Sequence, residues 1–540
     1  MTILTISRRC VLPFVIAVLC YPPFASGQVT FSSARLNAIM NAYHQLGLFN
    51  GNVLIANNEN IIFQQSYGAA DLSSNRKNSA VTRFNIYSIT KPFTSTVILQ
   101  LAGENLLSLD EPISRFFPTL SAADSITVRH LLTHSSGLFA YNNDFSMPVT
   151  SEAAMLSWLG EKPLDFRPGS QFRYNNTGYY LLGYIIEKLT GQSYEAAVRS
   201  RIFVPAGMNQ SGFDLRTAAK QTKATGYSYI GVKTQEKAAV WDYRELFSAG
   251  GIYSTATDLL LFQRALQNKK LLPDSSLKEA YTPFQKNYGY GWFIDSIGGQ
   301  LIVSHSGGAT GFRTYLVQNL TTNTCIILLG NSETSDIVTL RNKLLDELNG
   351  RPYQLPATIP GLSQRLSQYE GVYPLTPSLV LYVHQEKGQL MATPSRQGSS
   401  ILLPVGNDEF RIESKAADFL FKGYRNGSFD SLVFSQKGQT VTAARMDASW
   451  GITGNATPNG WNGPDIVMQR EGRLWIAKKV KLNTGIIKFR YNNDWVLNYG
   501  LNPSTRRLQK GGGDIEVTAG TYTILLDLKN KDRPTWKLVR

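Results

Sequence analysis

Cysteine is scarce in this chain of 540 residues, which contains three. Cys10 and Cys20 belong to an apolar N-terminal stretch, so Cys325 has no partner left for an intramolecular disulfide. Cys325 lies in the strand-like run "NTCIILLGN", which favours a buried core position. A fold held together by disulfides is therefore excluded.

Metal-ligand clusters and long apolar runs are also missing. The five histidines form no cluster with Cys or Asp at metal-ligand spacing, so we expect neither a metal nor another cofactor. Beyond the N-terminal stretch, no segment reaches the roughly 18 apolar residues that a membrane-spanning helix needs. No nucleic-acid-binding motif occurs, and we do not expect a nucleic-acid partner.

The N-terminal stretch itself has the pattern of a secretory signal. Arg8 and Arg9 precede the short apolar run "CVLPFVIAVLCYPPF", and the small residues of "ASGQ" follow it. We predict a signal peptide over residues 1–27 and a mature protein in the periplasm, the cell envelope or the medium. Leu19 is large where a lipoprotein signal has a small residue, which disfavours a lipid anchor on Cys20.

Acidic residues are fewer than basic ones, 39 against 54, so the formal net charge is +15. Residues 450–540 hold fifteen Lys or Arg and seven Asp or Glu, a net charge of +8. Such a surface attracts anionic polymers or lipid headgroups. A basic surface that is simply solvated explains the charge equally well, so both interpretations stay open.

Hydrophobic patterning divides the chain into four parts after the signal. Residues 28–352 alternate helical and strand patterns, with strands at both ends and helices between, which predicts an α+β domain whose ends meet in one sheet. A Pro-rich linker follows over 353–364. Short alternating strands then fill 365–447 and 448–540, which predicts two small all-β domains.

The spacing Ser-x-x-Lys occurs three times, and only one copy has a suitable context. The copy at 74–77 sits in a polar loop, and in the copy at 275–278 Asp274 or Ser275 is better explained as a helix cap. Ser88 and Lys91 alone open a long apolar helix, where residues three apart share a face. A base close to the hydroxyl makes serine a nucleophile, and burial can lower the pKa of lysine enough for that task.

Two further segments supply the other groups that acyl transfer needs. "FRPGSQFRYNNTGYY" presents Tyr174 and Asn176 between a Pro-Gly turn and an amphipathic helix. The same Tyr-Asn-Asn triplet recurs at Tyr141 and Tyr491 without that setting. "VSHSGGATGF" ends a strand with glycines, which would let a substrate carbonyl approach backbone N–H groups.

The ordered set "SITK", "LLTHSSGL", "FRPGSQFRYNN", "SAGGIYSTATDLLLF", "YGYGW" and "HSGGATGF" resembles the serine β-lactamase and penicillin-binding-protein family. It is most similar to the branch of class C β-lactamases, D-alanyl-D-alanine carboxypeptidases and esterases. The resemblance implies a β-lactamase/transpeptidase-like domain and an acyl-enzyme mechanism. It also implies the following site: Ser88 as nucleophile, Lys91 and Tyr174 as proton carriers, Asn176, His305, Ser306 and Gly307 against the substrate, and the backbone N–H groups of Ser88 and Gly308 as oxyanion hole.

One departure from the family pattern bears on the substrate. Family members that hydrolyse lactams carry Lys where this chain has His305, and histidine is about neutral at pH 7. The expected reaction is hydrolysis of an amide or ester, on a D-Ala peptide, a β-lactam-like compound or a small ester. The alternatives are a carboxylesterase and a non-catalytic penicillin- or glycan-binding protein. His130 and His134 are expected to cap or pack a helix.

The two C-terminal parts resemble known modules. Residues 365–447 are similar to the lipocalin-like domain that follows such hydrolases, and 448–540 to the starch-binding modules of SusE/SusF-type proteins. Five of the eight tryptophans lie in the last part, and their flat faces suit stacking on sugar rings. We expect Trp461 and Trp495 to be exposed glycan contacts, with a cell-envelope glycan as partner, and Trp475 and Trp536 to be core.

Overall fold

The computed structural model describes residues 32–140, 151–230, 235–240, 242–395, 397–503, 505–529 and 533–540. The predicted signal peptide and Tyr141 lie outside them. The first part of the chain is built on a six-stranded antiparallel sheet. In sheet order its strands are β10 (Phe293–Ile297), β11 (Gln300–Ala309), β12 (Phe312–Asn319), β13 (Thr324–Gly330), β1 (Gly51–Asn57) and β2 (Asn60–Tyr67).

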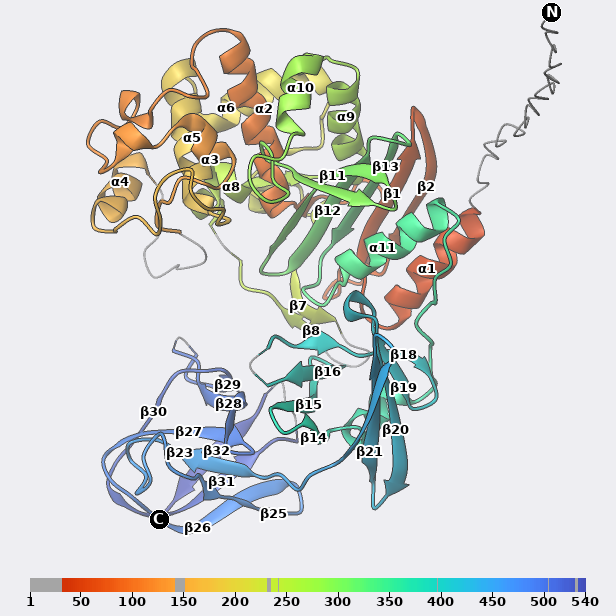
Figure 1. The fold of residues 1–540 in the computed structure, drawn as a ribbon, viewed down its shortest axis with the longest axis vertical. Helices are drawn as coiled ribbons and strands as arrows, with labels where there is room; N and C mark the ends of the chain where they lie inside the picture. The colour runs from red at the N-terminus through yellow and green to blue at the C-terminus, as the bar shows by residue number, and fades with distance from the viewer. Residues whose placement is uncertain are drawn as a thin grey trace, which may run out of the picture.

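Helices cover both faces of this sheet (Figure 1). One face packs against α1 (Ser33–Gln45) and α11 (Ile337–Leu348) around a smaller core. The other carries the larger core beneath the remaining helices. These are α2 (Thr90–Gly103), α3 (Val128–Leu132), α4 (Glu152–Gly160), α5 (Asn176–Thr190), α6 (Tyr194–Val198), α7 (Val204–Ala206), α8 (Phe247–Gly250), α9 (Ala256–Gln267) and α10 (Asp274–Ala280).

The predicted closure of the sheet by the two ends of the domain is confirmed. β1 pairs with β13 in antiparallel register from Gly51 opposite Gly330 to Asn57 opposite Thr324. Both strands are apolar and almost wholly buried because helices lie on both faces of the sheet. The sheet thus holds β11 beside η1 (Tyr87–Ile89), the turn that leads into α2, and this order of elements brings residues near 90, 175 and 305 together.

The middle part is all β. Two antiparallel sheets enclose one core, which α12 (Leu362–Arg365) helps to close. Their strands are β14 (Gly371–Thr376), β15 (Leu379–Glu386), β16 (Gln389–Pro394) and β17 (Ser400–Ile401) in one, and β18 (Leu403–Gly406), β19 (Glu409–Ile412), β20 (Ala417–Arg425), β21 (Ser428–Gln436) and β22 (Gln439–Ala444) in the other. Leu403 packs into the core under α1 and α11, and Lys343 pairs with Glu413 at 2.9 Å, so this part is joined to the first.

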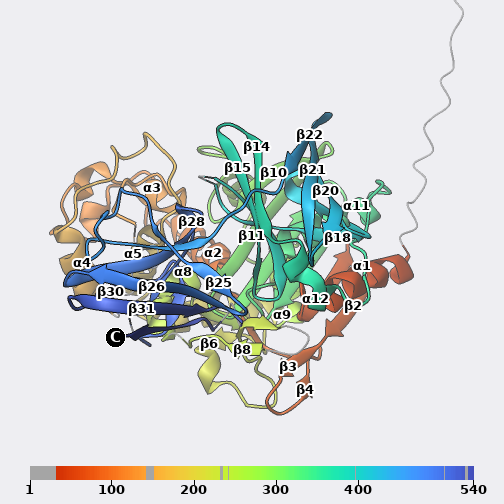
Figure 2. The same cartoon turned by 90° about the horizontal axis from the view of Figure 1, so that it is seen from below.

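The last part has two more antiparallel sheets around a separate core. The first contains β23 (Trp450–Thr453), β24 (Ile466–Val467), β27 (Gly485–Tyr491), β28 (Asp494–Leu501), β29 (Leu508–Lys510) and β30 (Ile515–Val517). The second contains β25 (Gln469–Glu471), β26 (Leu474–Leu482), β31 (Gly520–Asp527) and β32 (Thr535–Val539). Figure 1 shows the middle part below the six-stranded sheet and the last part below the helices around α4 and α5. In Figure 2, seen from below, the strands of the last part lie in front of these helices. Within the described residues, no helix is long and apolar enough to cross a membrane.

Candidate active site

Ser88 lies in a short 3-10 turn, η1 (Tyr87–Ile89), that leads directly into α2. The sequence predicted Ser88 at the head of this helix, and it lies two residues before the first α-helical residue, Thr90. Tyr87 has a positive φ of 46°, which is strained for a non-glycine residue, and its hydroxyl donates to the carbonyl of Thr310 at 2.7 Å. This bond and the buried Tyr87 ring hold the turn, while the Ser88 side chain stays partly exposed.

Lys91 is fully buried one turn further along. Its Nζ lies 3.1 Å from Ser88 Oγ, 2.8 Å from Asn176 Oδ1 and 2.9 Å from the carbonyl oxygen of Ala249. It also lies 4.9 Å from the centre of the Tyr174 ring. Burial lowers the pKa of Lys91 well below its usual value, because the ammonium form loses its hydration.

These contacts fit a neutral amine. Neutral Nζ has two hydrogens, and the two oxygens of Asn176 and Ala249 can only accept hydrogen bonds. In the neutral form both hydrogens are thereby used, and the lone pair is left for the hydroxyl of Ser88, 3.1 Å away. The arrangement can therefore take a proton from the serine.

Each residue of the Tyr-Asn-Asn triplet at the start of α5 makes a different contact. Tyr174 is hydrogen-bonded with Ser88, and burial raises its pKa, so the phenol keeps its proton. Asn175 is the N-cap, since its Oδ1 accepts from the N–H of Thr177 at 2.8 Å. Asn176, the first residue of the helix, points its amide oxygen at Lys91. The triplet therefore brings two predicted site residues to the nucleophile.

His305 stands on β11, on the face that looks toward the helices. It is buried, its Nδ1 donates to the carbonyl of Ser306 at 2.7 Å, and its Nε2 lies 3.1 Å from the hydroxyl of Tyr288. Burial lowers the pKa of His305 to about 3. Neutral His305 therefore accepts a hydrogen bond from Tyr288 and offers no positive charge.

Gly307 and Gly308 follow on the same strand. A Cβ on Gly307 would lie 1.9 Å from the carbonyl oxygen of Ile86, so only glycine lets η1 pack this closely on β11. Pairing between β10 and β11 ends at Ser304, whereas β11 continues to Ala309 against β12. The exposed Gly308 thus lies on a stretch of strand beyond the end of β10, close to the turn that carries Ser88.

Sequence reasoning did not identify three contributors. Ala249, in α8, supplies a carbonyl to Lys91, and a backbone carbonyl has no signal in residue type. Tyr288 holds His305; it stands in the quoted segment "YGYGW" but no role was assigned to it. His134 contacts the backbone beside Tyr174. His130 does cap α3, since it exchanges backbone and side-chain bonds with Thr127.

The competing motif copies lie elsewhere. Residues 74–77 run from the turn after β3 (Ala69–Asp71) into β4 (Arg76–Lys77), and 275–278 belong to α10. α10 begins at Asp274 with Pro273 as N-cap and no side-chain cap bond, so the cap predicted for Asp274 or Ser275 is wrong. Tyr491 ends β27 in the last part of the chain.

In the last part, Trp461 and Trp495 form a pair at the surface. Their ring centres are 5.9 Å apart with planes inclined by 38°, and Trp495 is 45 % exposed. The guanidinium of Arg490 lies 4.9 Å from the Trp495 ring centre and is ion-paired with Asp465. Neither tryptophan belongs to the core, whereas Trp475 and Trp536 pack against it, as expected.

Comparison with known proteins agrees with this geometry. Residues 35–349 match the Beta-lactamase family. Penicillin-binding protein 4* of Bacillus subtilis (strain 168) is 28% identical over 406 residues, which are 69% of this chain and 90% of that protein.

Two solved structures are also similar to this chain. A penicillin-binding protein from Bacillus halodurans has a TM-score of 0.51 and 27% identity, and the match covers 57% of this chain and 98% of that one. The D-amino acid amidase of Ochrobactrum anthropi SV3, complexed with L-phenylalanine amide, has a TM-score of 0.50 and 25% identity, over 58% and 98% of the two chains. Since the family match spans more than half of the residues, the chain belongs to the Beta-lactamase family.

Proposed function

We propose that this protein is an exported serine hydrolase that cleaves an amide or ester through an acyl-enzyme on Ser88. The observation that carries the proposal is the set of three bonds on buried Lys91, which leaves a lone pair for the serine hydroxyl. An intact set of this kind argues against the non-catalytic alternative. The signal-like residues 1–27 support export.

The proposed reaction begins with transfer of the Ser88 proton to neutral Lys91 as Oγ attacks the substrate carbonyl carbon. The backbone N–H groups of Ser88 and Gly308 stabilise the oxyanion. Tyr174, kept protonated by burial, donates a proton to the leaving group and is reprotonated from Lys91. Water then attacks the acyl-enzyme with the same groups acting in reverse, which releases the acid and restores Ser88.

Neutral His305 shapes the proposed substrate preference. A carboxylate-bearing lactam needs a positive partner, and His305 supplies none. The amidase and the penicillin-binding proteins among the relatives support amide substrates with a D-configured or peptide-like acyl group. Membership of the class C, carboxypeptidase and esterase branch is part of this proposal.

A side-by-side turnover screen tests the proposal. The substrates are nitrocefin, a p-nitrophenyl ester and a D-Ala-D-Ala peptide, each with wild type and Ser88→Ala. We expect ester or peptide turnover to exceed lactam turnover, and all of it to depend on Ser88. Equal rates in the Ser88→Ala variant would refute the serine mechanism, and lactam turnover above the others would refute the role given to His305.

A second function is proposed for the last part of the chain. The pair of half-buried Trp461 and exposed Trp495 supports binding of a glycan by stacking, as the resemblance to SusE/SusF-type modules implies. Such binding would hold the hydrolase at the cell envelope. The domain boundaries at 352/353, 364/365 and 447/448 belong to this proposal.

A further inference from the structure

His134 occupies a conformation that is unusual for its residue type. It follows α3 and the C-cap Thr133 with a positive φ of 55°, a position where helices ordinarily have Gly or Asn. The N–H of Ser135 bonds back to the carbonyl of His130 at 3.0 Å, which closes the helix end. A strained residue persists only where its surroundings fix it, and such residues gather at functional sites.

The backbone and side chain of His134 bond to the residues on either side of Tyr174. The carbonyl oxygen of His134 accepts from the N–H of Arg173 at 2.9 Å. Its ring Nδ1 accepts from the N–H of Asn175 at 3.1 Å. The two ring centres of His134 and Tyr174 are 4.3 Å apart. The main chain on each side of the phenol, and the phenol itself, are therefore held by one residue.

The hydrogen bond to Asn175 also fixes the tautomer of the ring. A backbone N–H can only donate, so Nδ1 of His134 carries no proton and Nε2 does. Nε2 is buried and has no hydrogen-bond partner in the described part of the chain, with the rings of Tyr179 and Tyr288 close by. Burial lowers the pKa of His134 well below its usual value, which keeps the ring neutral. Among the described residues, the one hydrogen bond of the imidazole ring is thus the one to Asn175, beside Tyr174.

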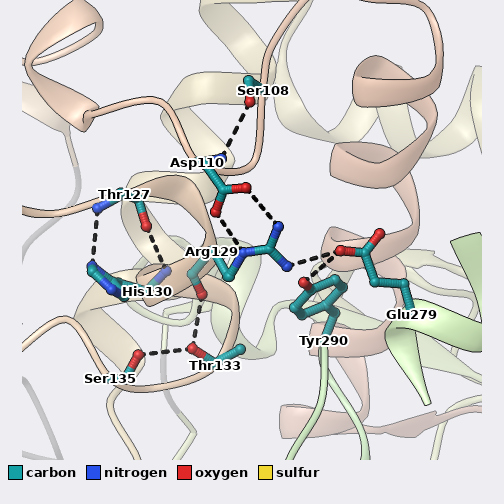
Figure 3. A network of polar contacts seen from close by, with 9 residues as sticks. All are labelled: Ser108, Asp110, Thr127, Arg129, His130, Thr133, Ser135, Glu279 and Tyr290. Carbon is teal, nitrogen blue, oxygen red and sulfur yellow. Dashed lines mark hydrogen bonds and ion pairs between the residues drawn. The ribbon is translucent and has the colours of Figure 1, made fainter. Parts of the chain in front are cut away.

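The loop that carries His134 is itself anchored. Thr133 Oγ1 donates to the carbonyl of Arg129 and lies 2.8 Å from Ser135 Oγ. Arg129 is ion-paired with Asp110 at 2.6 Å and Glu279 at 2.8 Å, which ties α3 to α10 (Figure 3). The position of the imidazole is therefore set by the surrounding elements and not by the loop alone.

We propose that His134 is a positioning residue: its carbonyl and Nδ1 fix the main chain around Tyr174 so that the phenol stays on Ser88. This inference rests on the proposed role of Tyr174 as a proton carrier. The proposal requires the side chain at position 134 to place a hydrogen-bond acceptor where Nδ1 now lies. Asparagine Oδ1 occupies that place and tolerates positive φ, whereas glutamine Oε1 occupies the place of Nε2.

The test compares His134→Asn and His134→Gln, each alone and combined with Tyr174→Phe. The rate of acylation is measured by mass spectrometry with benzylpenicillin, whose amine must be protonated as it leaves, and with a fluorophosphonate, whose fluoride need not be. We expect His134→Asn to stay within about threefold of wild type and His134→Gln to acylate roughly 10–100-fold more slowly with benzylpenicillin, below the full loss of a proton carrier. The loss with the fluorophosphonate should be smaller, and His134→Gln should add less than about threefold in the Tyr174→Phe background.

Thermal melting accompanies each variant. Equal losses of acylation rate in folded His134→Asn and His134→Gln variants would overturn the proposal. It would also be overturned if His134→Gln slowed acylation as much in the Tyr174→Phe background as it does in the wild-type background. If His134→Gln does not fold, His134→Asn decides alone: near-wild-type acylation supports the proposal, and a folded variant with a 100-fold loss overturns it. A harmless Tyr174→Phe would instead overturn the role of Tyr174 and this inference with it.

Discussion

Several residues at this site adopt environments or backbone conformations that lower the stability of the fold but suit the proposed reaction. Lys91 is buried as a base, although removing an ammonium group from water is costly. Tyr87 and His134 both hold positive φ angles that side chains disfavour. Lys91 and Tyr87 lie within three residues of Ser88, and the His134 ring packs against that of Tyr174, so these three unfavourable features lie beside the proposed reacting groups.

Lys91→Met tests the burial of a neutral lysine. Acylation should fall roughly 10²–10⁴-fold, because the proton acceptor is lost. In the unfolded state of wild type, Lys91 is protonated at pH values below about 10.5, its usual pKa. In the folded state its pKa is lowered, so the side chain releases that proton at a lower pH. Protonation of the unfolded state therefore destabilises wild type at neutral pH, and this cost disappears as the pH rises toward 10.5.

The melting temperature of Lys91→Met relative to wild type should thus be highest near pH 7 and decline toward pH 10. Thermal unfolding across this range measures it. Lys278→Met, in the exposed Ser-x-x-Lys copy on α10, is the control and should show no such trend. A difference that does not vary with pH would mean that Lys91 is charged in the folded protein.

His305→Lys tests the basis of specificity. A lysine at this position would place a cationic group where neutral histidine now stands, and should shift the ratio of kcat/KM for nitrocefin over a p-nitrophenyl ester toward the lactam. Steady-state kinetics with the two substrates gives the ratio. If the ratio does not change, the substrate carboxylate is bound elsewhere or not at all.

The elements follow the sequence pattern closely, and the exceptions have physical causes. The pairing of β1 with β13 and the start of α5 after Asn175 were predictable, because apolar runs and cap residues carry local signals. The contact of Lys91 with Ala249 spans 158 positions and uses a backbone carbonyl, for which no local signal exists. His134 was predicted to cap or pack a helix, and its ring does pack, but its bond to Asn175 depends on tertiary structure.

Gly307→Ala tests the contact between two elements, η1 and β11. The new Cβ would collide with the carbonyl of Ile86, so η1 should shift and acylation should fall roughly tenfold or more, with a loss of about 1–3 kcal/mol in unfolding free energy. Acylation kinetics and denaturant unfolding measure the two effects.

Gly103→Ala is the matched control, since nothing lies within 4 Å of its Cβ at the exposed end of α2. It should leave acylation unchanged and stabilise the helix by up to about 1 kcal/mol. Equal behaviour of the two variants would contradict the close packing of η1 on β11.

Across the whole molecule, the last part of the chain adds net positive charge and a surface tryptophan pair to the hydrolase. It is joined to the middle part by Tyr382, whose hydroxyl donates to Asp494 at 2.8 Å, and by the ion pair of Lys510 with Glu386 at 2.7 Å. Asp494 directly precedes Trp495, so the proposed glycan site lies beside this junction.

Trp495→Ala in the full chain tests the glycan site. We expect weaker retardation by starch in affinity electrophoresis and an unchanged melting temperature, because Trp495 is exposed. Tyr424→Ala, an equally exposed aromatic in the middle part, should have no effect. Stacking on starch should be nearly independent of salt, whereas retardation by an acidic polysaccharide through the basic surface should weaken as salt rises. Absence of retardation by either polymer would refute a glycan-binding role.

Covalent labelling of Ser88 tests the proposed serine mechanism most directly. Wild type and Ser88→Ala are incubated with a fluorophosphonate and followed by intact-protein mass spectrometry. We expect one adduct per wild-type chain, located on Ser88, and no adduct on the variant, because Lys91 activates that hydroxyl alone. Stoichiometric labelling that persists in Ser88→Ala would contradict this mechanism.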